Sequence, residues 1–132
     1  MKCLIVEDDA ISSQILVGMI SRYAASDVVI NGQEALNLFL QAQESNSPYD
    51  LILMDIMMPG TNGLQAVRSI REKEASMNIP LGLRVKIIMT TALDDPRNVM
   101  KALYESDANS YLIKPIKLQK LEGELRILKL IP

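Results

Sequence analysis

Residues 51–63 read LILMDIMMPGTNG. Four apolar residues, 51–54, lead directly into a single carboxylate, Asp55, and Pro59 follows four residues later. A short apolar run bounded by turn-forming residues is typical of a buried β-strand. Asp55 therefore stands where such a strand ends. It is either a turn residue whose side chain bonds the local backbone or a carboxylate that takes part in a chemical reaction.

Apolar runs and helical patterns alternate on both sides of this segment. Between the runs, apolar residues recur at helical spacing, as Leu64, Val67 and Ile70 do. Short apolar strands that alternate with helices predict a parallel sheet covered on both faces, and right-handed crossovers then give a doubly wound α/β domain. We expect one domain over residues 1–132. The predicted strands are 2–6, 27–30, 51–54, 85–89 and 110–113.

Local signals predict where some elements begin and end. Asn31 is a candidate N-cap for the second helix, and Asp94 or Asp95 can cap a helix that has Pro96 in its first turn. The charged stretch 71–85, which contains a proline and a glycine, predicts an extended loop between the third helix and the fourth strand.

The composition excludes several classes of function. The net charge is −2 without a basic stripe, so direct nucleic-acid binding is not expected. The single cysteine, Cys3, excludes a disulfide framework and is expected in the core. The absence of histidine removes histidine bases and histidine metal ligands. No apolar run suits a signal peptide or a membrane span, so we expect a cytoplasmic protein without membrane association.

Polar side chains follow four of the five predicted strands. Because ligands bind outside the carboxyl ends of the strands in open α/β sheets, we expect these side chains to meet on one rim. Singly, each has an ordinary structural explanation, such as helix capping by Asp8 or Asp9. The residues concerned are Glu7, Asp8 and Asp9 after the first strand, Asp55 after the third, Thr90 and Thr91 after the fourth, and Lys114 after the fifth.

Carboxylates gathered on one rim repel each other and raise one another's pKa. A nearby ammonium, such as Lys114, and a bound divalent cation would both relieve this repulsion. An all-oxygen site with open positions suits Mg²⁺, whereas zinc favours nitrogen or thiolate ligands.

Four segments together resemble the signature segments of the receiver domain of bacterial two-component response regulators, of the single-domain, chemotaxis-regulator-like type. They are LIVEDD, LILMDIMMPGTNG, IIMTTA and YLIKPI, and they occur in the family's order along essentially the whole chain. The resemblance implies a flavodoxin-like (βα)5 fold with strand order 2-1-3-4-5. This order would place the first and third strands side by side and bring Asp8 next to Asp55.

The resemblance also implies a role for each matching residue. Asp55 is similar to the phospho-accepting aspartate, and Lys114 to the lysine that neutralises the phosphoryl group. The implied Mg²⁺ (or Mn²⁺) ligands are Asp8, Asp55 and the backbone carbonyl of Met57, with Glu7 acting through water. The implied switch residues are Thr91 and Tyr111, and the peptide bond before Pro115 is implied to be cis.

The implied function is a signalling switch. A partner histidine kinase or phosphotransfer protein would donate a phosphoryl group from phosphohistidine to Asp55. The face built from the fourth helix, the strand 110–113 and the last helix would then change and control a downstream protein, or form a phosphorylation-dependent homodimer. We expect no enzyme activity beyond self-catalysed phosphotransfer and slow self-dephosphorylation, since the flanking Met57 and Leu93 are apolar and cannot orient water.

Three other interpretations remain open. A phosphatase with an aspartate nucleophile would need a general acid at position 57, which is Met57. A flavin-binding electron carrier would need a phosphate-binding loop after the first strand, where acids stand instead. A degenerate receiver would lack some of the site residues.

The departures from the family pattern are Glu7 in place of Asp, Ile116 in place of Phe, and a longer loop near 74–84. The last helix is expected to reach about residue 128, which favours a stand-alone receiver.

Overall fold

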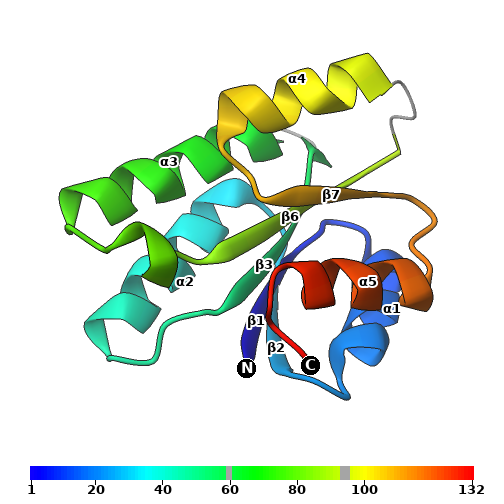
Figure 1. The fold of residues 1–132 in the computed structure, drawn as a ribbon, viewed down its shortest axis with the longest axis horizontal. Helices are drawn as coiled ribbons and strands as arrows, with labels where there is room; N and C mark the ends of the chain where they lie inside the picture. Colours follow the sequence, from blue (N-terminus) through cyan, green and yellow to red (C-terminus); the bar gives the residue numbers. More distant parts are fainter. Residues whose placement is uncertain (59–60, 93–95) are drawn as a thin grey trace.

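In the computed structural model, the chain forms three layers, with a parallel sheet between two layers of helices (Figure 1). The structure describes residues 1–58, 61–92 and 96–132. The sheet contains five strands in the order β2-β1-β3-β6-β7, and all four pairings are parallel. The predicted doubly wound fold and strand order are confirmed. The strands are β1 (Lys2–Val6), β2 (Ala25–Val29), β3 (Leu51–Asp55), β6 (Lys86–Thr91) and β7 (Ser110–Ile113).

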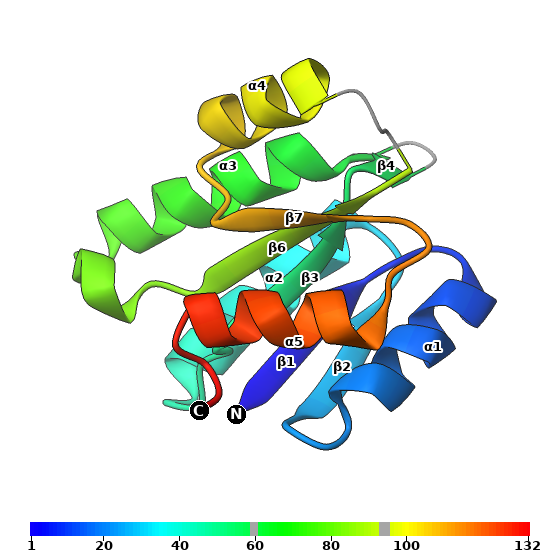
Figure 2. The same ribbon diagram turned by 45° about the vertical axis from the view of Figure 1, so that its right-hand side comes forward.

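Helices cover both faces of the sheet (Figures 1 and 2). Successive residues of a strand point to opposite faces, so Leu4 and Val6 join one core cluster whereas Cys3 and Ile5 join the other. The first cluster includes residues of α2, α3 and α4, and the second includes residues of α1 and α5. The helices are α1 (Ala10–Ile20), α2 (Gly32–Glu44), α3 (Gly63–Ser76), α4 (Pro96–Ser106) and α5 (Leu118–Ile127).

Side-chain caps begin several helices. The predicted cap of α2 is confirmed, because Asn31 Oδ1 accepts a hydrogen bond from the Glu34 backbone N–H over 2.9 Å. Pro96 is the first residue of α4, as expected, while Asp94 and Asp95 lie outside the described residues. After four of the helices the chain leaves through a residue in the left-handed region, a common way to end a helix. These residues are Asn46, Asn78, Asp107 and Lys129.

The second strand was predicted at 27–30 but lies at Ala25–Val29. This strand forms one edge of the sheet, where β1 alone sets its register, from Lys2 opposite Ala25 to Val6 opposite Val29. Because an edge strand tolerates polar residues, the apolar pattern of the sequence was a poor guide to its start.

The predicted loop over 71–85 is wrong in its first half. The helix α3 continues to Ser76, and a 3-10 turn, η1 (Leu81–Leu83), follows. The charged residues 71–74 thus belong to a helix, in which Glu72 and Lys73 are exposed but Glu74 is not. Glu74 is fully buried and forms an ion pair with Arg71, with 2.7 Å between Oε1 and Nη1.

A small antiparallel hairpin follows Asp55 and was not predicted. Its strands, β4 (Met57–Met58) and β5 (Thr61–Asn62), pair Met57 with Asn62. Asn62 then caps α3, because its Oδ1 accepts a hydrogen bond from the Leu64 backbone N–H over 2.9 Å. Among the described residues, no helix is both long enough and apolar enough to cross a membrane.

Candidate functional site

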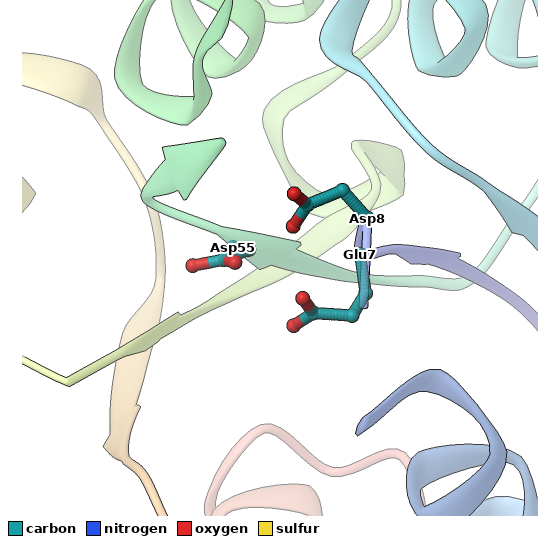
Figure 3. Close-up of side chains that lie close together, drawn as sticks. All are labelled: Glu7, Asp8 and Asp55. Atoms are coloured by element: carbon teal, nitrogen blue, oxygen red, sulfur yellow. The ribbon is translucent and has the colours of Figure 1, made fainter. Parts of the chain in front are cut away.

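Three carboxylates meet at the carboxyl edge of the sheet. Each of Glu7, Asp8 and Asp55 offers an oxygen, and these oxygens all lie within 4.8 Å of one another (Figure 3). The adjacency of β1 and β3 explains this meeting, since Val6 pairs with Met54 and the acids follow directly. Glu7 and Asp55 are buried, whereas Asp8 is exposed. The cluster is therefore buried on the side of Glu7 and Asp55 and open to solvent on the side of Asp8.

Asp9 does not belong to this cluster. Its Oδ1 accepts a hydrogen bond from the Ile11 backbone N–H over 3.1 Å, and its Oδ2 accepts one from the Ser12 hydroxyl over 2.8 Å. The hydrogen bond from Ser12, followed by that from Ile11, lowers the pKa of Asp9. Asp9 is thus the N-cap of α1, which leaves Asp8 as the exposed acid of the cluster.

Lys114 supplies a cation on the buried side of the cluster. Its Nζ donates hydrogen bonds to Glu7 Oε2 over 2.8 Å and to Asp55 Oδ2 over 3.1 Å. Burial disfavours the ammonium, but these bonds outweigh the effect and raise the pKa of Lys114. Burial also raises the pKa of Glu7 more than the hydrogen bond from Lys114 lowers it, and the negative charge of Asp55 adds to the rise.

The backbone around Asp55 is held closely. The Met57 N–H donates to Asp55 Oδ1 over 3.2 Å, and the Gly63 N–H donates to the Ile56 carbonyl over 3.0 Å. A Cβ atom at Gly63 would overlap the Asp55 carbonyl oxygen, so only glycine fits at this position. Gly63 is the last residue of the segment LILMDIMMPGTNG, and no role was predicted for it from the sequence. Its signal was a glycine directly before a helical pattern.

The remaining predicted residues lie around this cluster. Thr90 and Thr91 end β6 and are buried, and the Thr91 carbonyl accepts a hydrogen bond from the Lys114 N–H over 2.7 Å. Tyr111 pairs with Met89 in the sheet, is half-buried and packs against the first core cluster. The peptide bond between Lys114 and Pro115 is cis. The Met57 side chain is exposed, and Leu93 lies outside the described residues.

A model of the response regulator receiver domain matches residues 3–126. The chain belongs to this family. ResD, a transcriptional regulatory protein of Bacillus subtilis, is 37% identical to it over 115 residues, which are 86% of this chain and 42% of ResD. The chain thus spans less than half the length of the first curated relatives that it matches.

Two solved receiver domains share the fold. The receiver domain of the histidine kinase CKI1 from Arabidopsis thaliana, complexed with Mg²⁺ and BeF₃⁻, has 27% identity and a TM-score of 0.82, and the match covers 97% of this chain and 89% of that one. The receiver domain of the response regulator Ssk1 of Saccharomyces cerevisiae, crystallised with the phosphotransfer protein Ypd1, has 28% identity and a TM-score of 0.76. That match covers 94% of this chain and 85% of that one.

The acidic cluster of this receiver domain fits a hard divalent cation. Its three donors are carboxylate oxygens, and one of them, on Asp8, belongs to an exposed residue. The chain contains no histidine, and its one cysteine, Cys3, is buried in the sheet. Because Mg²⁺ prefers oxygen ligands and completes its shell with water or phosphate oxygens, the donor set suits Mg²⁺ rather than zinc.

Proposed function

We propose that Asp55 of this receiver domain accepts a phosphoryl group from a phosphohistidine on a histidine kinase or phosphotransfer protein. The observation that carries the proposal is the meeting of the buried Asp55 carboxylate with Lys114 and two further acids at one edge of the sheet. The complex of the Ssk1 receiver with Ypd1 supports a phosphotransfer protein as one type of donor. Under this proposal, residues 1–132 act in the cytoplasm as one regulatory domain and not as an enzyme with a separate substrate.

In the proposed reaction, an Asp55 carboxylate oxygen attacks phosphorus and forms a new P–O bond. The P–N bond of the phosphohistidine breaks and its electron pair stays on the departing nitrogen, so that neutral imidazole leaves when the other ring nitrogen carries a proton. Asp55 needs no general base, because its carboxylate is already the nucleophile. Lys114 stays within hydrogen-bond distance of Asp55 and balances the charge that arrives with the phosphoryl oxygens.

The chain offers the ligands that a metal ion would need. Bound Mg²⁺, or Mn²⁺ in its place, would neutralise charge on the carboxylates and on the transferring oxygens. We assign Asp8, Asp55 and the backbone carbonyl of Met57 as direct ligands and Glu7 as a ligand through water. Glu7 accepts the shorter of the two hydrogen bonds from Lys114, so one of its oxygens is already engaged, which suits the indirect position.

We further propose that phosphorylation changes the face formed by α4, β7 and α5. A phosphoryl group brings about two negative charges and three acceptor oxygens. Thr91 ends the strand next to Asp55, so its hydroxyl can turn toward the phosphoryl group, and Tyr111 on β7 can follow inward. This change would control a downstream protein or the formation of a homodimer. Phosphorylation can shift the population toward the changed state only by the amount by which it stabilises that state more than the resting state.

The first test is mass spectrometry of the intact protein after incubation with acetyl phosphate and Mg²⁺. We expect one phosphoryl adduct, which is lost when EDTA replaces Mg²⁺ and is absent in Asp55→Asn. Asp107→Asn is the matched control, since Asp107 is an exposed carboxylate after α4 and asparagine tolerates its left-handed backbone. An adduct that persists in folded Asp55→Asn would refute the assignment.

The switch is tested separately with Thr91→Ala and beryllofluoride in the presence of Mg²⁺. We expect this variant to bind beryllofluoride but to leave the NMR signals of β7 and α5 close to those of the resting state. If these signals shift as fully as they do in the wild type, Thr91 is not the switch residue.

A further inference from the structure

A second feature lies at the opposite end of the sheet from Asp55. Lys86 begins β6, and Thr91 ends it beside the acidic cluster, so these two ends are about 16 Å apart. A groove of about 740 Å³ opens beside Lys86, between the α2–β3 loop, the segment from α3 to β6 and the end of α5. Both chain termini lie at this end of the sheet (Figures 1 and 2).

The segment between α3 and β6 is braced by a buried ion pair. Glu74 Oε2 accepts a hydrogen bond from the Val85 N–H over 2.8 Å, and Arg71 Nη1 donates to the Val85 carbonyl over 2.8 Å. The Ile79 N–H donates to the Glu74 carbonyl over 3.0 Å, and Arg84 Nε donates to the Ile79 carbonyl over 3.1 Å. The backbone of this segment is therefore held in a defined path by interactions within the domain.

This braced segment presents large apolar side chains to solvent. Leu81 and Leu83 are 77% and 76% exposed, and Met77 is 40% exposed. Single exposed apolar residues are ordinary, but two leucines held outward on the 3-10 turn η1 add nothing to the core of the domain. Leu83 and Met77 also line the groove, which suits the burial of partner side chains.

The charge of the groove indicates the chemistry of its partner. Its charged lining residues are one acid, Asp50, and three bases, Arg84, Lys86 and Lys129, which gives a net charge of +2 in a chain whose net charge is −2. The acid is already engaged, because Asp50 Oδ2 accepts a hydrogen bond from the Lys2 N–H over 2.8 Å. The three bases form no salt bridge with any carboxylate of the described residues.

We propose that this groove is a docking site for an acidic, leucine-bearing peptide segment of a partner protein. The apolar side chains of such a segment would enter the groove beside Leu83 and Met77, and its carboxylates would meet Lys129, Lys86 and Arg84. A hollow of this volume receives side chains better than it receives a flat bilayer, which favours a peptide over an anionic membrane. The site is separate from the acidic cluster, so the proposal does not require phosphorylation of Asp55.

The test uses a fluorescein-labelled helical peptide that carries leucines on one face and glutamates at the borders of that same face, so that both can reach the groove. Two matched peptides have serine in place of leucine, or lysine in place of glutamate. We expect the acidic leucine peptide to bind about tenfold more tightly than the serine peptide, as the burial of one or two leucines would give. The lysine peptide should not bind.

Variants locate the binding to the groove. Leu83→Ser should weaken binding about tenfold, since one buried leucine is lost. Lys129→Asp should weaken it about fivefold, because this change reverses a charge while aspartate still tolerates the left-handed backbone. The controls are Tyr104→Ser and Lys101→Glu, which change an exposed aromatic and an exposed cation on α4. Asp55→Asn should bind as the wild type does.

Any of three outcomes would overturn the proposal. The first is binding that Leu83→Ser and Lys129→Asp leave unchanged, and the second is equal binding of the serine and leucine peptides. The third is the absence of peptide binding. If the protein then binds vesicles of phosphatidylcholine and phosphatidylserine, and Leu83→Ser abolishes that binding, the partner is a membrane and not a peptide.

Discussion

The ammonium of Lys114 lies 3.1 Å from Asp55 and 2.8 Å from Glu7, so that one cation serves two buried carboxylates. Lys114 reaches them from the end of β7, whereas Glu7 and Asp55 follow β1 and end β3. The strand order therefore brings one ammonium and two buried carboxylates together from three distant parts of the chain. The proposed phosphotransfer depends on this arrangement.

Replacement of this cation should slow the chemistry more than it harms the fold. We expect Lys114→Met to lower the rate of adduct formation from acetyl phosphate by about 100-fold, as the loss of a donor at a developing charge does elsewhere. Lys117→Met is the matched control, because it removes an exposed cation three residues away. Rates are measured by intact mass over time, with circular dichroism to check folding. A rate within about threefold of the wild type would leave Lys114 with a structural role only.

Gly63 is expected to be intolerant of any side chain. Gly63→Ala would push a Cβ atom into the Asp55 carbonyl oxygen, and forced contacts of this kind cost about 1–3 kcal/mol. The free energy of unfolding in urea should fall by that amount, and phosphorylation should slow because Asp55 moves. The control is Gly123→Ala within α5, where nothing lies within 4 Å and alanine should stabilise the helix by about 0.5–1 kcal/mol. Equal unfolding free energies for the two variants would contradict this account of Gly63.

The ion pair between Arg71 and Glu74 should contribute to stability far more than a surface pair. Arg71→Met leaves a buried carboxylate without its partner, a change that costs about 3–5 kcal/mol. Arg68→Met removes the exposed pair between Arg68 and Glu105, which is worth about 0–1 kcal/mol. Chemical denaturation of the two variants makes the comparison. A loss below about 1 kcal/mol for Arg71→Met would mean that the carboxylate finds another partner or water.

The Cys3 thiol should resist modification while the protein is folded. Burial, and then the negative charge of Asp27, raises the pKa of Cys3 to about 12 from 9.0. An aromatic disulfide reagent at pH 8 should therefore react only after denaturant is added. The prediction fails if the thiol of the native protein reacts as quickly as that of the unfolded chain.

The raised pKa of Cys3 also predicts a loss of folding stability at alkaline pH. Between pH 9 and 12 the unfolded thiol releases its proton first, so the folded state binds more protons and stability falls as pH rises. The expected slope is roughly 1.4 kcal/mol per pH unit in the wild type relative to Cys3→Ala. The comparison with Cys3→Ala removes the contributions of lysines and of tyrosines other than Tyr49, whose pKa the charge of Cys3 also raises. Parallel pH profiles for the two proteins would contradict the assignment.

The sequence was sufficient to predict the sheet and most of the site. The parallel sheet and the gathering of polar residues at one edge follow from periodicity and from the rule that parallel strands bring their carboxyl ends together. The strand order and the roles of the site residues came from the resemblance to receiver domains. The sequence was not sufficient where tertiary partners decide the structure. The helix α3 extends past Arg71 because Glu74 bonds Val85, eleven residues away, and no local pattern carries that information. The choice between Asp8 and Asp9 as the cap likewise required the hydrogen bonds from Ile11 and Ser12.

The role of Gly63 shows a similar limit. A glycine before a helix is common, and the sequence alone does not reveal that this one touches the backbone of Asp55. The two-residue strands β4 and β5 were also beyond prediction, because they are shorter than any periodicity can register.

The measurement that most directly tests the central claim is chemical trapping of the acyl phosphate. The protein is phosphorylated with acetyl phosphate and Mg²⁺, reduced with sodium borohydride and digested, and its peptides are sequenced by mass spectrometry. Reduction converts a phosphorylated aspartate to homoserine, and we predict homoserine at position 55 alone. Homoserine at Asp8, or the corresponding reduced residue at Glu7, would contradict the assignment of Asp55 as the acceptor. The same conclusion would follow if the reduced protein carried the mark at several exposed acids.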